Sequence, residues 1–213
     1  MERTAAVVAL EDQLWAEYLT ALDGERPTAA LVAIEFLHEL RPRNTFYAYV
    51  RGKALRVVGR HTEAEQLLLE AHANFMGKDI YCVELALGDV YRDAGRPRQA
   101  EEWFRRALAS APDTTAPYVY LAGFLASQER FAEACAVLEG GMNAKGDPDE
   151  VQLNLALNRR ALGDLDGARV AALKALQLSP DYEHARKTLT DIESAIGMRA
   201  VYQPRVANVA REE

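Results

Sequence analysis

The sequence has little cysteine, little proline and no long apolar run, and each scarcity excludes a class of protein. With two cysteines in 213 residues, Cys82 and Cys135, it is not a disulfide-rich secreted scaffold, and we expect reduced thiols rather than a disulfide. Charged residues interrupt every apolar stretch, which argues against a membrane-spanning helix. Glu2 and Arg3 precede a brief apolar run that ends at Glu11, so a secretory signal is not expected. We therefore expect a cytoplasmic protein with no membrane insertion.

Basic residues are also scarce, because 25 Lys and Arg face 32 Asp and Glu, for a formal net charge of −7. A protein that neutralises nucleic-acid phosphates needs a basic face, so we expect no nucleic-acid partner. The apolar fraction of 49% and the charged fraction of 27% are typical of a folded soluble chain. The frequent Ala, Leu, Glu and Arg favour helix, since they lose little side-chain freedom there. The Ala- and Arg-rich usage favours a bacterial cytoplasm.

Residue patterns for catalysis or metal binding are scarce as well. The four histidines share no helix face with one another, and no cysteine joins them at ligand spacing: His38, His61, His72 and His184. The sequence has no glycine-rich phosphate loop, and nothing in it indicates a nucleophile with a base beside it. We therefore predict no catalytic residue, no metal and no cofactor, and the chain is not expected to be an enzyme.

What the sequence does contain is an internal repeat. Four segments share the pattern glycine, four residues, alanine, the last of them with Glu in place of Gly: Gly59–Ala64, Gly95–Ala100, Gly163–Ala168 and Glu129–Ala134. In chain order the alanines are 36, 34 and 34 residues apart. A small residue follows seven positions after each alanine: Ala71, Ala107, Gly141 and Ala175. A near-constant step of this kind indicates repeated units rather than a generic helical bundle with accidental spacing.

The repeated pattern predicts two helices joined by a tight turn. Glycine supplies the positive φ that is needed just past a helix C-terminus. The alanines fit where two helices cross closely, because a larger side chain there would push the helices apart. Pro112 and Pro180 then end the second helix of their units.

The clearest unit resembles the tetratricopeptide repeat family. Its first helix carries Leu87-Gly88-Asp89-Val90-Tyr91, its second carries Ala100-Glu101-Glu102-Trp103-Phe104 with Ala107, and Pro112 follows. Glu84 replaces the first aromatic residue of the family motif. The resemblance implies an all-α fold, a right-handed α-solenoid of helix-turn-helix units with a C-terminal capping helix.

On this model a lead-in at 1–10 precedes a solenoid at 11–197. The solenoid comprises five units and a cap: 11–44, 45–78, 81–114, 115–148, 149–182 and the capping helix 182–197. The first unit is the weakest, because Glu17 and Tyr18 stand where Leu-Gly is typical. The tail at 198–213 shows no helical stripe and is expected to be flexible, or to fold back into the groove.

The resemblance also implies that the first helix of each unit lines a concave groove that binds a partner. The groove positions are Phe46, Tyr49, Lys53, Arg56, Leu85, Asp89, Arg92, Val119, Tyr120, Gly123, Leu153, Asn154, Leu157, Arg160 and Lys187. Tyr49 and Tyr120 are candidate anchors, since an aromatic ring gives a large contact area at small entropic cost. Packing between units is the alternative for both.

This predicted groove contains five cations and one anion, Asp89, on an acidic chain. It should therefore attract a peptide or helix with acidic groups and apolar anchors. Reversing Arg56 and Arg92 is expected to weaken binding with little effect on folding. The competing interpretation is that each cation pairs with a neighbouring carboxylate.

The function that we expect is a non-catalytic protein–protein interaction scaffold or adaptor, which binds a peptide or helix of another protein in the concave groove. One alternative is a secretion-type chaperone for an apolar client segment, although such chaperones usually carry three units. The other is an accessory repeat module of an enzyme complex.

Overall fold

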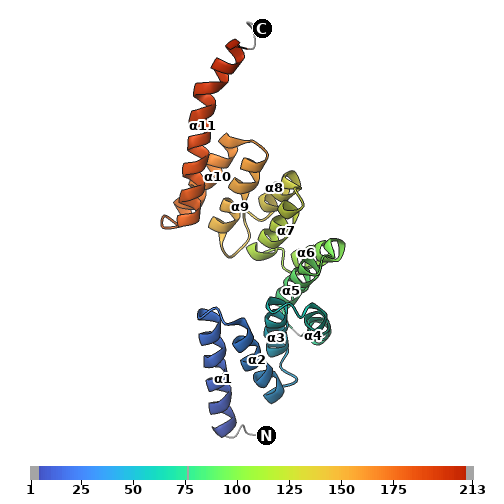
Figure 1. Ribbon diagram of the computed structural model, residues 1–213. Helices are drawn as coiled ribbons and strands as arrows, with labels where there is room; N and C mark the ends of the chain where they lie inside the picture. The colour runs from blue at the N-terminus through green and yellow to red at the C-terminus, as the bar shows by residue number, and fades with distance from the viewer. Residues whose placement is uncertain (1–4, 76, 210–213) are drawn as a thin grey trace. The chain divides into compact units, whose positions relative to one another are not determined.

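The computed structural model describes residues 5–75 and 77–209, which form helices joined by short turns (Figure 1). Residues 1–4 of the expected lead-in, residue 76 of the second unit and residues 210–213 of the expected tail lie outside the described residues. The chain divides into two compact units, Met1–Ser110 and Ala111–Glu213. Within the described ranges no strand forms, apart from an isolated bridge between Thr114 and Lys145. The all-α prediction is confirmed.

The first unit contains six helices in three antiparallel pairs: α1 (Ala5–Asp23), α2 (Pro27–Leu40), α3 (Thr45–Val57), α4 (His61–Asn74), α5 (Ile80–Asp93) and α6 (Pro97–Ser110). Each odd-numbered helix packs against the even-numbered helix that follows it. The pairs are then linked by packing of α2 on α3 and of α4 on α5.

The second unit contains two more pairs and a long last helix: α7 (Thr115–Ser127), α8 (Phe131–Gly140), α9 (Pro148–Ala161), α10 (Leu165–Leu178) and α11 (Glu183–Val209). The pairs α7–α8 and α9–α10 pack on each other, and α11 packs on α10 (Figure 1). In the part of the chain that the structure describes, no helix is both long and apolar enough to cross a bilayer.

The turn inside each pair has a residue in the left-handed backbone region. Gly59, Gly95 and Gly163 have φ of 81°, 72° and 79°. Glu129, which replaces glycine in the fourth copy, has φ of 59°, and Glu25 takes the same role in the first pair with φ of 52°. The repeat therefore imposes this conformation even where a side chain makes it unfavourable.

Small residues lie where the two helices of a pair meet. Ala64, Ala100, Ala134 and Ala168 are all fully buried. On the facing helix, a Cβ added to Gly88 would lie 2.5 Å from Cε1 of the Phe104 ring. The glycine thus lets the Phe104 side chain fill the space between α5 and α6.

The last helix covers the end of the repeat array and then continues beyond it. Ala185 and Ile192 are fully buried, and Ala185 packs in a cluster with Leu153 and Ala175. The helix runs through Pro204 to Val209 instead of ending at 197. The expected tail therefore needs correction over residues 198–209, which are helical, because apolar residues recur there at helical spacing that the small and polar residues between them obscured.

Candidate partner-binding surface

Five aromatic side chains from α1 and α3 lie together in the first unit. The Trp15 ring stacks on Tyr18 at 5.1 Å between centroids, and it lies 5.7 Å from Phe46 and 6.3 Å from Tyr47. The rings of Phe46 and Tyr49 are 6.5 Å apart. Two of the predicted groove residues, Phe46 and Tyr49, thus belong to one continuous aromatic cluster.

Trp15 and two leucines extend this cluster along α1, although the sequence interpretation did not include them. Trp15, Leu19 and Leu22 are spaced four and three residues apart, so they share one helix face. They precede Tyr49, Lys53 and Arg56 by 34 residues each, which is the repeat step that would have identified them. We define the aromatic face as the set Trp15, Leu19, Leu22, Phe46, Tyr49 and Lys53.

Three members of the aromatic face are exposed although they are large and apolar. Leu19 is 45% exposed, Leu22 is 48% exposed and Phe46 is 48% exposed. Isolated exposed leucines are ordinary on protein surfaces, but a cluster of apolar residues indicates a contact surface. This part of the first unit therefore offers apolar area that the described fold does not use.

A buried carboxylate fixes the position of α1 beside this face. Glu11 is 7% exposed and accepts hydrogen bonds from Nε of Arg41 at 3.1 Å and from Nη2 at 3.0 Å. The Tyr47 hydroxyl donates to the same carboxylate at 3.3 Å. At the start of α3, the Asn44 side chain accepts from the Phe46 backbone N–H at 3.0 Å, which satisfies a free donor of the first turn.

Two of the predicted cations, Arg56 on α3 and Arg92 on α5, are paired rather than free. Nη1 of Arg56 lies 2.6 Å from Oδ2 of Asp93, and Nη1 of Arg92 lies 2.8 Å from Oδ1 of Asp89. Arg92 also donates from Nε to Asp93 at 3.0 Å. These two arginines and two aspartates form a cluster without net charge. Asp93, which the sequence interpretation left out, completes it.

Burial affects the two aspartates of this cluster differently. Desolvation raises the pKa of Asp89 above its ordinary value, despite the nearby guanidinium groups of Arg92 and Arg56. Desolvation also acts on Asp93, but hydrogen bonds from Arg56 and Arg92 outweigh it and lower the pKa. Replacing both arginines with glutamate would place four acidic side chains together, of which Asp89 is buried. We therefore expect that double variant to disturb folding, contrary to the sequence expectation.

Lys53 differs from the other predicted cations. Its side chain is exposed, and Nζ lies 5.3 Å from the centre of the Tyr49 ring, in a cation–π arrangement. In the described part of the chain it makes no ion pair with a carboxylate. Lys53 is therefore the charged group of the aromatic face that remains available to an anionic partner.

The predicted positions in the second unit are divided between core, ion pairs and surface. Leu153 is 2% exposed and Leu157 packs against its cluster, so Leu153 stabilises the repeat instead of contacting a partner. Nη1 of Arg160 pairs with Oδ2 of Asp191 at 2.6 Å. Lys187 pairs with Glu183 at 2.6 Å, one turn earlier on α11. Two of the five predicted cations are thus neutralised here as well.

The other predicted groove positions differ in how much of each side chain is exposed to a partner. Tyr120 is 42% exposed and Val119 is half-buried on α7. Nδ2 of Asn154 donates to the Glu150 carbonyl at 2.9 Å within its own helix. In the first unit, Leu85 is only 6% exposed. Its side chain, like that of Leu153, has little surface to offer a partner.

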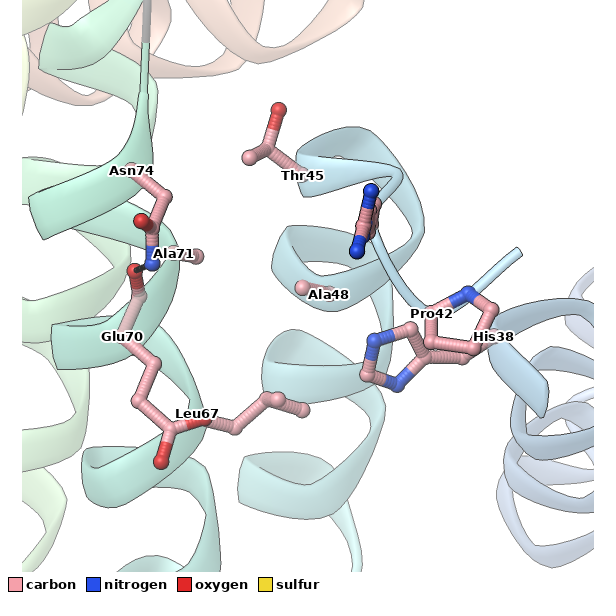
Figure 2. A pocket seen from close by; sticks show the side chains of 9 residues that line it. His38, Pro42, Thr45, Ala48, Leu67, Glu70, Ala71 and Asn74 are labelled. Carbon is pink, nitrogen blue, oxygen red and sulfur yellow. Dashed lines mark hydrogen bonds between the residues drawn. The ribbon is translucent and has the colours of Figure 1, made fainter.

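A cavity of about 460 Å³ lies on another side of the first unit, between α2 and α4 with α3 as its floor (Figure 2). Figure 2 shows His38 and Pro42 on one wall and Glu70 and Asn74 on the opposite wall. Nδ1 of His38 lies 3.2 Å from Nη1 of Arg51, and burial, followed by that guanidinium, lowers the pKa of His38. Residues 5–75 and 77–209 contain no group of three metal-ligating side chains, here or elsewhere. We regard this cavity as a groove between successive helix pairs.

Family comparison agrees with the helix pairs. Two family models, both described as tetratricopeptide repeat, match the sequence, one over residues 45–113 and the other over residues 85–148. Residues 45–148 of the chain are tetratricopeptide repeats. No match was found among curated proteins. Members of this family are generally non-catalytic repeat scaffolds, and the repeats of this chain support a general role in protein–protein interaction.

Solved structures support the same fold for this tetratricopeptide repeat protein. A thermophilic repeat protein of Thermus thermophilus, TTC0263, is 19% identical with a TM-score of 0.68, over 85% of this chain and 98% of that one. PilF of Pseudomonas aeruginosa is 20% identical with a TM-score of 0.60, over 85% and 82%. YrrB, described as a repeat protein with an unusual peptide-binding site, is 18% identical with a TM-score of 0.53, over 80% and 87%.

Proposed function

We propose that this protein is a scaffold that binds a peptide or helix of another protein against the aromatic face of α1 and α3. The observation that carries the proposal is the continuous aromatic cluster, in which Phe46 is half exposed next to Trp15, with exposed Leu19 and Leu22 on the turns of α1 that follow Trp15. Aromatic rings surrounded by apolar residues are the usual anchors of protein interfaces. The peptide-binding site named for the similar protein YrrB is consistent with this role.

The composition of the face specifies the chemistry of the partner segment. Two or three apolar side chains would cover Leu19, Leu22 and Phe46. One carboxylate near them would pair with Lys53, whose ammonium is already oriented by the Tyr49 ring. The partner we propose therefore has apolar anchors and a single essential acidic group, fewer than the five predicted cations implied.

An affinity measurement with matched variants tests this proposal. The partner is first captured with the intact protein and then titrated against Phe46→Ala and Lys53→Glu. Leu69→Ala, which alters a 37% exposed leucine on α4, is the control. We expect Phe46→Ala to weaken binding by tenfold or more through faster dissociation, because it removes an anchor. Lys53→Glu should weaken binding and reduce its dependence on salt.

The intrinsic fluorescence of a tryptophan in the chain can follow this titration. Trp15 lies in the aromatic face, and the other tryptophan, Trp103, contacts His72 and Arg106. In a Trp103→Phe background, the emission of Trp15 should change as the partner binds. Equal losses of affinity for Phe46→Ala and Leu69→Ala, or no change in either, would remove the site from the aromatic face.

The exposed apolar residues also support a second candidate, a chaperone for an apolar client segment. Leu19, Leu22 and Phe46 would bind such a client through apolar contacts alone, so the client would need no charged group. The Lys53→Glu variant separates the two candidates. A chaperone would keep its affinity for the client and would bind unrelated apolar segments, whereas the scaffold would lose affinity for its acidic partner.

A further inference from the structure

A second apolar surface lies on the outer side of the first helix pair. A groove of about 350 Å³ is lined by Leu10, Leu14, Phe36, Glu39 and Leu40 from α1 and α2. Leu10 is 44% exposed and Phe36 is 50% exposed, and Val32, one turn before Phe36, is 46% exposed. Among the described residues nothing covers this groove, and it shares no residue with the aromatic face.

The repeat register shows how unusual this surface is. Adding the 34-residue step to Leu14, Phe36 and Leu40 gives Ala48, Glu70 and Asn74, which line the cavity between α2 and α4. In that equivalent site, the walls are more polar and the preceding pair contributes His38 and Pro42 (Figure 2). Terminal repeats ordinarily have the more polar outer face. Here the outer face is the more apolar, so it has the character of a surface that another helix covers.

A helix with a matching face occurs at the other end of the chain. Met198, Val201, Tyr202 and Val206 are spaced at helical intervals on the last part of α11. They are 60%, 47%, 56% and 67% exposed. This stretch extends past the buried part of α11, which ends near Ile192 and half-buried Ile196.

The charges of the two surfaces are complementary. Helices α1 and α2 contain no lysine or arginine and six acidic residues, of which Glu11 pairs with Arg41, and Glu35 with Arg51 and Arg60. The other four are Asp12, Glu17, Asp23 and Glu39. From Gly197 to its end at Val209, α11 contains Arg199 and Arg205 and no acidic residue. Glu39 lies in the groove itself, where an arginine flanking the apolar stripe would reach it. An acidic apolar groove and a basic amphipathic helix are therefore present on the same chain.

We propose that the groove between α1 and α2 takes residues 198–206 of α11 from a second copy of this protein, head to tail. The helix occupies the place that a preceding helix pair fills elsewhere in the array. A head-to-tail contact that does not close into a ring continues into longer chains. The average mass in solution therefore rises with concentration, and high salt lowers it.

Sedimentation of the full chain over a range of concentrations tests this assembly. Phe36→Glu places a charge in the groove, and Val201→Glu places one on the stripe. Each is expected to weaken self-association at least tenfold. Val170→Glu, at a 50% exposed position on α10, is the matched control and should leave it unchanged. Circular dichroism checks the fold, and Val32→Glu replaces Phe36→Glu if that variant is not helical.

Mixing the two variants gives the sharpest result. The Phe36→Glu chain keeps an intact stripe and the Val201→Glu chain keeps an intact groove, so the mixture should form heterodimers and nothing longer. A wild-type protein that stays monomeric at every concentration overturns the proposal. Association that survives both changes, or a mixture that stays monomeric, overturns the head-to-tail contact. The outcome is independent of partner binding, because no residue of the aromatic face is altered.

Discussion

Replacing Gly88 on α5 with alanine tests whether close packing inside a pair determines this fold. The added Cβ would lie 2.5, 2.6 and 2.8 Å from three carbons of the Phe104 ring, which is fully buried. Carbon atoms prefer separations of about 3.5–4.0 Å, so the ring has to move by roughly 1 Å in a packed interior. Gly123 on α7 provides the contrast, because a Cβ there would have no neighbour within 4 Å.

Two effects determine the expected magnitudes. Alanine is favoured over glycine inside a helix by about 0.5–1 kcal/mol at either position. At Gly88 the overpacking costs about 1–3 kcal/mol in addition. Gly123→Ala should therefore stabilise the protein by about 0.5–1 kcal/mol. Gly88→Ala should lie about 1–3 kcal/mol below Gly123→Ala, and that difference isolates the contact with Phe104.

Urea unfolding followed by circular dichroism at the helix minimum measures both variants. The slope of the free energy of unfolding against urea should be unchanged, so that shifts of the midpoint report stability. If the two alanine variants have the same midpoint, Phe104 does not approach α5 as described, and the packing account of the helix pair is refuted.

Three further outcomes are expected from single positions. Glu129→Gly should stabilise the protein by about 0.5–1 kcal/mol, because the left-handed turn is unfavourable for a residue with a side chain. Gly95→Glu should destabilise it for the same reason, and thermal unfolding measures both variants. Hydrogen bonds from Arg96 hold the pKa of Glu65 below its ordinary value of 4.5, so this pair stabilises the fold above that pH, and the stabilisation is lost as pH falls through the lowered pKa. Glu65→Gln should show a shallower loss of stability below pH 4.5, measured by urea unfolding. Burial raises the pKa of the Cys135 thiol, so a thiol reagent at neutral pH should modify it more slowly in the folded protein than in urea.

The repeat is the part of the structure that the sequence predicts well, because its signals are local. The left-handed turns need a specific backbone conformation, and the sequence shows it directly at Gly59, Gly95 and Gly163. The buried alanines recur at a near-constant step, because only a small side chain fits where the two helices of a pair cross. Even Glu129, which breaks the pattern, is identified by its place in the repeat.

The candidate surface was predicted less well, because it depends on which side chains meet. The sequence shows Arg56 and Arg92 as cations, but not that Asp89 and Asp93 neutralise them. It also places Leu85 at a groove position, although that side chain is 6% exposed. Such pairing and burial arise from contacts between neighbouring helices, which no pattern within one helix contains.

The end of the chain illustrates a different limit. Between Met198 and Val206 the apolar residues are separated by polar residues, by Ala200 and by Pro204, and a proline inside a segment normally argues against helix. The structure continues α11 through this segment as an exposed helix. A stripe of only four apolar residues is difficult to distinguish from a polar tail by periodicity alone.

Site-specific photo-crosslinking tests most directly whether the aromatic face binds the partner. A photoreactive residue would be placed at Leu22, which is 48% exposed on α1, and separately at Leu69, which is 37% exposed on α4. A photoreactive residue at Leu22 should capture the partner identified by affinity, and adding Lys53→Glu should reduce the yield. Crosslinks to the partner from Leu69 alone, or equally from both positions, would contradict it.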